Sequence, residues 1–290
     1  MPVEQTITRA RAGSRTPAGL LGDLLVHFSL WIGATIMVLP FLWMVSTSLK
    51  PLGEVSIFPP EWIPHTILWK NYLDIFQIYP FARFGLNSIQ IAVLATTGEL
   101  VTCTLSAYAF ARMRFPGRNL IFVLLLATLM VPGQVTMIPT FIMFSKIGWV
   151  NTYLPLIVPA WLGPAFGTFL MRQFFLTLPR DYNDAASIDG AGQFRIMAMI
   201  YVPLAKPAIA TLALFAFLRY WNEFLLPVIY LNDENLMTLP VGLSFFTQQY
   251  NTLYQYLMAG SVVSIIPILL LFVFLQKYFV RGFVMSGLKG

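Results

Sequence analysis

Residues 179–207, PRDYNDAASIDGAGQFRIMAMIYVPLAKP, decide the fold, because they form the one long polar-punctuated segment between two apolar stretches on the basic side. Pro179 is expected in the first turn of a short helix, where a missing N–H costs nothing, and two aspartates follow near the positive end of its dipole. Gly190 is expected to end that helix in the left-handed conformation. A second short helix should follow and end where Val202 and Pro203 turn the chain. The segment predicts a helix, a glycine turn and a second helix.

The composition around this segment is that of a membrane protein. Of 290 residues, 58% are hydrophobic and only 10% are charged, which excludes a soluble domain with an ordinary polar surface. The net charge of +6 does not indicate nucleic acid, since basic residues clustered at the ends of spans follow from the positive-inside rule. A single cysteine, Cys103, excludes an intrachain disulfide.

Six apolar runs are each near the ~20 residues that cross a hydrocarbon core. They predict an all-α membrane protein with six transmembrane helices and both termini in the cytoplasm. Residues 1–19 are expected to be a cytoplasmic tail, and the first run is too long to be a cleaved signal peptide. Residues 20–290 then form one transmembrane domain, with spans at about 20–45, 86–111, 119–143, 153–176, 207–230 and 256–280.

The basic residues orient these spans. Thirteen fall on the expected inner side and four on the outer side, which favours a cytoplasmic location for residues 179–207 and for the tail 281–290. The inner set is Arg9, Arg11, Arg15, Arg112, Arg114, Arg118, Arg172, Arg180, Arg195, Lys206, Lys277, Arg281 and Lys289, and the outer set is Lys50, Lys70, Arg83 and Lys146.

The polar segment resembles the cytoplasmic "EAA" loop of the membrane-spanning subunits of bacterial ABC importers. That pattern is Glu-Ala-Ala, three residues, Gly, nine residues, Ile, one residue, Leu and Pro, and here Asp184 replaces Glu and Val202 replaces Leu. The resemblance implies that the loop docks in a groove on a separate ATPase through Asp184, Ala185, Ala186, Asp189, Gly190, Ile200 and Pro203. The alternative is an amphipathic connector on the membrane surface.

The end of the chain, LQKYFVRGFVMSGLKG at 275–290, looks like the terminal segment of maltose-type importer subunits. The WNEFLLP stretch at 221–227 and the loop that begins at Lys50 are also similar to carbohydrate importers. This resemblance implies that the tail contacts the ATPase subunits through Arg281, Ser286, Gly287 and Lys289. Binding of a basic tail to anionic lipid is the alternative.

The sequence contains neither a G-x-x-x-x-G-K-[ST] phosphate loop nor Cys/His metal spacing, so we expect no catalysis and no cofactor in this chain. The resemblance implies that ATP and Mg²⁺ are bound by a partner. The implied partners are a second homologous permease subunit, two ATP-binding subunits, an extracytoplasmic sugar-binding protein and lipid of the bacterial inner membrane.

Two alternatives to a sugar importer stay open. An ion-coupled secondary transporter or channel would explain charges inside the spans, although six spans are few and no inverted repeat is evident. An ABC importer could instead carry glycerol phosphate, an amino acid or a metal, and metal is least favoured because no span carries a ligand cluster.

Charged residues inside the expected spans form the last candidate site. Glu99 and Arg219 are each expected near the middle of a span, where a charge facing lipid is costly. Glu223 follows Arg219 by one helical turn, but Arg before Glu is the poorer orientation for such a pair. Arg219 is therefore expected to reach Glu99. The set, with Asn222, is either a buried ion pair or part of the translocation path.

Overall fold

The computed structural model describes residues 17–247 and 252–287, and within them the regular structure is helical apart from one isolated bridge between Thr247 and Thr252. The expectation of an all-α protein is confirmed. In chain order the elements are α1 Pro17–Ser48, α2 Leu52–Val55, α3 Asn71–Ile78, α4 Phe81–Arg112, α5 Arg118–Ala127, η1 Thr128–Met130, α6 Gly133–Lys146, α7 Leu154–Ile157, η2 Val158–Leu162, α8 Ala165–Thr177, α9 Asp181–Ile188, α10 Gln193–Ile196, η3 Met197–Tyr201, α11 Val202–Leu204, α12 Lys206–Trp221, α13 Leu225–Tyr230, η4 Glu234–Leu236, α14 Leu239–Ser244 and α15 Tyr254–Gly287.

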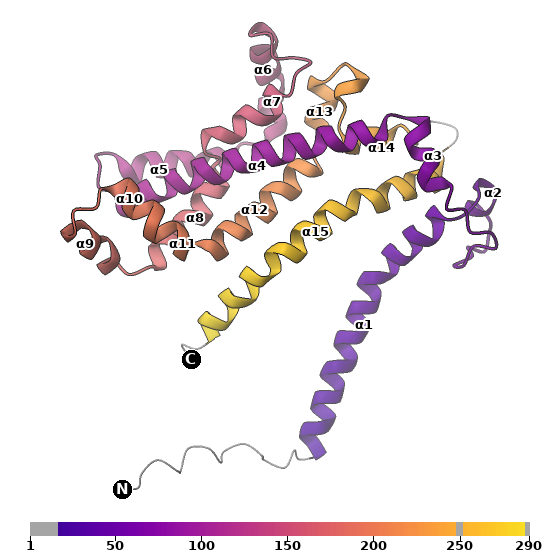
Figure 1. Cartoon of the computed structure of the whole chain (residues 1–290), viewed down its shortest axis with the longest axis horizontal. Helices are drawn as coiled ribbons and strands as arrows, with labels where there is room; N and C mark the ends of the chain where they lie inside the picture. Colours follow the sequence, from indigo (N-terminus) through magenta and orange to yellow (C-terminus); the bar gives the residue numbers. More distant parts are fainter. Residues whose placement is uncertain (1–16, 248–251, 288–290) are drawn as a thin grey trace.

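The long helices give the molecule two distinct ends (Figure 1). Short helices α2, α3 and α14 lie at one end, and α9, α10 and α11 lie at the other. Helix α4 is central and packs against both α8 and α12, whereas α1 packs against α15 and extends away from the rest of the bundle. The loop expected to be functional therefore lies at one end of the bundle.

Four helical segments of the described chain are long and apolar enough to cross a membrane: Gly22–Ser48, Phe81–Arg112, Leu154–Thr177 and Tyr254–Tyr278. Each overlaps one of the expected spans. Two further pairs of helices qualify only if each bent pair is counted as one span, so the described residues contain four to six candidate spans. The bends explain the difference from the six continuous spans expected from the sequence.

The span expected at 119–143 is not one straight helix. Arg118–Met130 and Gly133–Lys146 meet at 99°, with Pro132 at the junction. Proline lacks an N–H and disfavours a helical conformation in the residue before it, and Val131 is accordingly extended. The apolar run is continuous in sequence, but the helix through it is broken.

The span expected at 207–230 is also interrupted. Helix α12 ends at Trp221 and α13 begins at Leu225. The Asn222 amide donates to Leu218 O at 2.8 Å, and the Glu223 carboxylate accepts from Leu226 N at 3.1 Å. Side chains that bond to nearby backbone in this way favour helix ends over helix interiors.

The structure describes the two ends of the chain only in part. Helix α15 continues without a break from the last expected span to Gly287, through most of the tail expected at 281–290. No proline interrupts this apolar stretch after Pro267, so nothing in the sequence stops the helix at residue 281. Lys289 and residues 1–16 of the expected N-terminal tail lie outside the described residues.

Glycines allow the central helices to approach closely. A Cβ on Gly98 of α4 would collide with the Trp161 ring, and a Cβ on Gly167 of α8 would lie 2.7 Å from Cys103 Sγ. Substitution at either position would therefore force α4 away from the segment Leu154–Thr177. The tight packing places α4 side chains in direct contact with both α8 and α12.

Candidate functional site

The polar segment forms the helix, glycine turn and helix expected from its sequence. Helix α9 ends at Ile188, and Gly190 follows with φ of +77°. Gly190 N donates to Ser187 O at 3.1 Å, and Ala191 N donates to Ala186 O at 3.0 Å. This pair of bonds is a Schellman motif, which closes the end of the helix and requires a left-handed residue. The turn direction is thus set by Gly190.

Two details of the segment differ from expectation. Helix α9 begins at Asp181 with Arg180 as its N-cap, so Pro179 precedes the helix and does not lie in its first turn. Pro203 lies inside α11, in the first turn where its missing N–H is harmless, and the sharp bend of 80° falls between Leu204 and Lys206. The chain therefore turns at Ala205, two residues after Pro203, where the sequence suggested the turn.

A tyrosine of α4 holds both halves of the segment. The Tyr108 hydroxyl lies 3.1 Å from Asn183 Oδ1 on α9 and 2.9 Å from Gln193 Oε1 on α10. Its ring packs edge-on against Phe175 of α8 and Tyr201 of η3. One side chain thus connects a central helix to each side of the glycine turn.

Arg112, in the last turn of α4, adds a second attachment. Its guanidinium donates to the carbonyls of Phe175 and Leu178 and lies 4.9 Å over the Tyr201 ring. These carbonyls are at the end of α8, where the last C=O groups of a helix have no partner of their own. Tyr201 is fully buried in the same cluster. The segment is consequently fixed to α4 and α8.

The outer face of the segment carries no such partners. Asp184, Ala185 and Asp189 are exposed, and α9 contains no buried residue. The Ile188 side chain on one side of Gly190 is 86% exposed, and Phe194 on the other side is 72% exposed. Exposed large apolar groups on a firmly mounted turn are typical of a surface that binds another protein.

The structure places Glu99 and Arg219 in contact. Glu99 Oε2 accepts from the Arg219 guanidinium and from the Tyr220 hydroxyl, the latter at 2.8 Å, and Arg219 also donates to that hydroxyl at 3.0 Å. Glu99 is completely buried, whereas the Arg219 side chain is 45% exposed. The carboxylate is therefore the group that depends on its partners.

The position of Arg219 differs from the expected middle of a span. It lies in the last turn of α12, where a positive charge also interacts favourably with the helix dipole. Glu223 does not bond to Arg219 but caps α13 through Leu226 N. Asn222 likewise bonds locally to Leu218 O. Of the four residues in the set, Glu99 and Arg219 are in contact, whereas Asn222 and Glu223 bond to backbone at the break between α12 and α13.

Arg219, Tyr220 and Glu223 line a hollow of about 810 Å³. Its lining also includes residues of α6, of α13 and of the segment from Pro155 to Pro164, with polar groups and aromatic rings among them. Thr140 Oγ1 lies 3.2 Å from the Tyr230 hydroxyl, and the rings of Phe144 and Trp149 stack at 5.4 Å. Such a mixture of hydroxyls and ring faces can hold a polar organic molecule.

Sequence reasoning missed Tyr108, Asn183, Gln193 and Tyr220. Tyr108 stands in an apolar run where a tyrosine is ordinarily an interface anchor, so only the folded chain shows what it contacts. Tyr220 had one signal, its position next to Arg219. The described residues contain no group of three or more His, Cys, Asp and Glu that could hold a metal.

The tail residues of the expected ATPase contact can be placed only in part. Arg281, Ser286 and Gly287 belong to the helical backbone of α15. Their expected contact stays a prediction.

Comparisons with known proteins give a consistent result. The model of the family described as "Binding-protein-dependent transport system inner membrane component" matches residues 103–284. The arabinooligosaccharides transport system permease protein AraQ of Halalkalibacterium halodurans is 37% identical over 266 residues, which cover 89% of this chain and 93% of the relative. The sn-glycerol-3-phosphate transport system permease protein UgpE of Yersinia pestis is 34% identical, with 91% of this chain and 96% of the relative covered.

The fold also matches a solved structure. One chain in the crystal structure of a bacterial ABC transporter involved in the import of the acidic polysaccharide alginate superposes with a TM-score of 0.79. The match covers 91% of this chain and 98% of the other at 24% identity. At that identity the likeness concerns the fold.

Proposed function

Because the chain belongs to the family of binding-protein-dependent transport system inner membrane components, we propose that it forms half of a sugar translocation path and couples it to a separate ATPase. The chain is an inner-membrane permease subunit of an ABC importer. Membership in this family argues against the alternative hypothesis of an ion-coupled secondary transporter or channel. The proposal concerns the residues that transmit motion, the topology, the partners and the cargo.

The observation that carries the proposal is the mounting of α9. Tyr108 and Arg112 fix the segment to α4 and α8, while Ile188 and Phe194 stay exposed beside Gly190. A force applied to the exposed turn would be passed through these contacts to the central helices. The ATPase accordingly docks on α9, with Asp184 and Ala185 exposed to it and Ala186 half-buried against the cluster around Tyr201.

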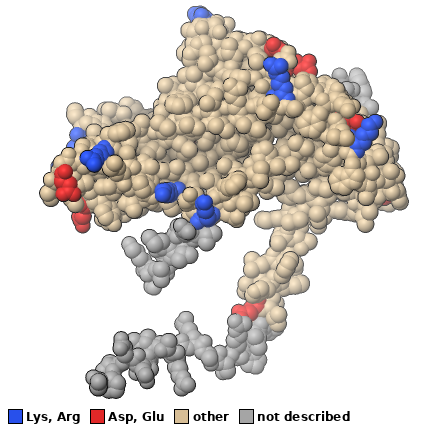
Figure 2. Space-filling model, viewed as in Figure 1, with Lys and Arg blue, Asp and Glu red and all other residues tan. Residues whose placement is uncertain are grey.

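The proposed topology has six spans with both termini in the cytoplasm. It is supported by two observations: each bent pair is apolar enough to be one broken span, and lysines and arginines lie toward the edges of the molecule with a broad uncharged area between them (Figure 2). Arg112, Arg172 and Arg195 then lie near the cytoplasmic face with α9.

The proposed cargo is a neutral sugar or oligosaccharide that passes beside the hollow. Two charged residues line the hollow, Arg219 and Glu223, and they are of opposite sign. Arg219 is already engaged by Glu99, so the hollow offers little net charge for an anion. Aromatic faces such as Trp149 and hydroxyls such as Thr140 suit sugar rings. This argument favours a sugar over glycerol phosphate, the cargo in the name of UgpE.

The remaining partners follow from the same proposal. The exposed faces of α1 and α6, with Trp31, Ile138 and Val135 mostly uncovered in this chain alone, are where a second permease subunit and lipid pack. Two ATP-binding subunits hold ATP and Mg²⁺, and an extracytoplasmic binding protein delivers the sugar.

The test of the function is reconstitution of the purified complex with its binding protein in vesicles. Uptake of labelled neutral oligosaccharides and ATP hydrolysis should rise together, while glycerol 3-phosphate and amino acids should stimulate neither. Uptake of a panel anion in preference to every neutral sugar would refute the proposed cargo.

A further inference from the structure

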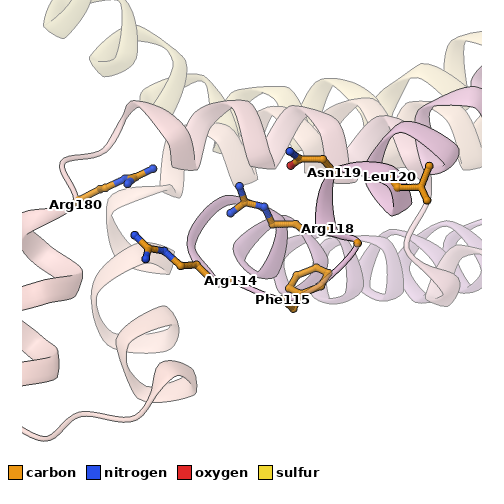
Figure 3. Close-up of a pocket in the computed structure, with 7 residues that line it drawn as sticks. Arg114, Phe115, Arg118, Asn119, Leu120 and Arg180 are labelled. Atoms are coloured by element: carbon orange, nitrogen blue, oxygen red, sulfur yellow. The ribbon is translucent and has the colours of Figure 1, made fainter.

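A second hollow, of about 520 Å³, lies at the α9 end of the molecule, separate from the one beside Arg219. Three of its lining residues are arginines: Arg114 from the connection between α4 and α5, Arg118 from the first turn of α5, and Arg180 from the turn before α9. Figure 3 shows the guanidinium groups of Arg114 and Arg118 directed toward the same space, with Arg180 extending into it from the facing segment. Among the residues that the structure describes, no acidic one lines this hollow.

The positive charge in this hollow is largely uncompensated. Neither the Arg114 nor the Arg180 side chain has a hydrogen bond or salt bridge to any described residue, and Arg118 donates only to Met113 O, at 3.0 Å. Gly117 and Asn119 at the start of α5 also line the hollow, and the first turn of that helix contains no acidic residue. The positive end of the α5 dipole therefore adds to the three guanidinium groups.

An apolar surface continues from this basic hollow. Leu120 is one of the lining residues and is 64% exposed, and Leu124, one helical turn further along α5, is exposed as well. The pair forms a strip that leads from the hollow along the helix. A ligand that satisfies both regions has a negative headgroup and an apolar chain.

We propose that this hollow binds the phosphate of an anionic phospholipid, with Arg114, Arg118 and Arg180 around the headgroup and an acyl chain against Leu120 and Leu124. The α5 segment is part of a candidate membrane span, so lipid is available there at high concentration. Guanidinium groups bind phosphate through paired N–H bonds. The apolar strip favours a lipid over a small soluble phosphate, which has nothing to place on it.

The position gives the lipid a structural consequence. Arg114 lies on the α4–α5 connection and Arg118 begins α5, whereas Arg180 is the N-cap of α9, so a bound phosphate joins these two parts of the chain. Without an anion, the three like charges repel one another. A bound phosphate therefore fixes the N-terminal end of α9, in addition to the attachment that Tyr108 makes to this helix. This inference is independent of which sugar is carried.

The test is native mass spectrometry of the purified importer complex, with phosphatidylglycerol and phosphatidylcholine supplied at equal concentration. The wild-type complex should retain phosphatidylglycerol in preference. The variant Arg114→Gln should retain it about fivefold more weakly, since a basic residue near an anionic surface contributes roughly that factor. Arg114→Gln with Arg118→Gln should reduce retention further. Arg114 is exposed and without hydrogen bonds, so its replacement leaves assembly intact.

Two controls make the result decisive. Lys277→Gln removes an exposed positive charge that does not line the hollow and should change nothing. Inorganic phosphate and glycerol 3-phosphate are added as soluble competitors and should not displace the lipid. If Lys277→Gln and Arg114→Gln lost equal amounts of retained phosphatidylglycerol, the arginines would act only as general surface charge. That result would overturn the site. Displacement by soluble phosphate, without preference for phosphatidylglycerol, would overturn the lipid assignment and leave a soluble phosphate site.

Discussion

The Arg219 guanidinium and the Glu99 carboxylate lie in contact between α12 and α4, although 120 residues separate them in the chain. The contact is unequal, since Glu99 is completely buried and Arg219 reaches the edge of a hollow. This difference in burial determines which of the two side chains can be replaced at the lower cost in stability.

Removing Arg219 should therefore be worse than neutralising Glu99. In Arg219→Gln, the buried carboxylate keeps only Tyr220, at a cost on the order of 3 kcal/mol, whereas Arg219 left by Glu99→Gln still borders the hollow. The double variant should recover part of the loss. The stabilities of the wild type, the two single variants and the double variant are compared by thermal unfolding of the detergent-purified complex. Strictly additive losses would contradict the pairing, and a changed apparent affinity for sugar at normal stability would place the pair on the transport path.

Gly167 should be required to accommodate Glu99. In Gly167→Ala the new methyl would lie 2.7 Å from Cys103 Sγ and 3.0 Å from Glu99 Oε1, so α8 must shift or the ion pair must move. We expect a loss of about 1–3 kcal/mol, partly relieved by Cys103→Ala. Gly85→Ala is the control, because nothing lies within 4 Å of that Cβ and alanine is the better helix former. Equal melting temperatures for Gly167→Ala and wild type would show that the packing is looser than described.

Gly190 should be sensitive to substitution through its backbone alone. A Cβ there meets nothing within 4 Å, but φ of +77° strains other residues by about 1–2 kcal/mol. Gly190→Ser and, more strongly, Gly190→Val should lower sugar-stimulated ATP hydrolysis and uptake at normal membrane levels. The matched control is Gly192→Ser, at an N-cap with ordinary φ of −69° where serine is favoured. If the substitutions at both glycines behaved alike, the left-handed turn would not be what matters.

Tyr108→Phe should weaken coupling without unfolding the bundle. The change keeps the packed ring and removes the hydroxyl that lies between Asn183 and Gln193, whose single proton the two side-chain oxygens share, a difference of about 1 kcal/mol. We expect fewer sugars imported per ATP hydrolysed. Tyr72→Phe removes a hydroxyl contact with Ser48 at the other end of the molecule and should leave this ratio unchanged. An unaltered ratio in Tyr108→Phe would remove the tyrosine from the proposed connection.

Much of the fold was readable from local rules. Run length and composition identified membrane helices because a hydrocarbon core imposes one length, and Gly190 was identified because few residues adopt a left-handed turn. The contact of Glu99 with Arg219 followed from the cost of an unpaired charge in lipid. Each of these depends on a constraint that acts on one or two residues.

The errors concern features that depend on three-dimensional context. An apolar run says nothing of its bend angle, so the 99° turn at Pro132 was read as one span. The sequence also did not show that Asn222 and Glu223 bond to nearby backbone at the break between α12 and α13, because that break depends on how the chain folds. Tyr108 could not be identified because its partners lie on α9 and α10, more than 70 residues away.

The central claim, that α9 is where the ATPase docks, is tested most directly by photo-crosslinking in the assembled importer. A photoreactive phenylalanine analogue is placed at Ile188, at Phe194 and, as a control, at Phe58, which is 91% exposed in the loop between α2 and α3. We predict that irradiation links positions 188 and 194 to the ATP-binding subunit, with higher yield at the better exposed Ile188, and never links position 58 to it. Crosslinks from positions 188 and 194 to lipid alone, in a complex that retains its ATPase, would contradict the account.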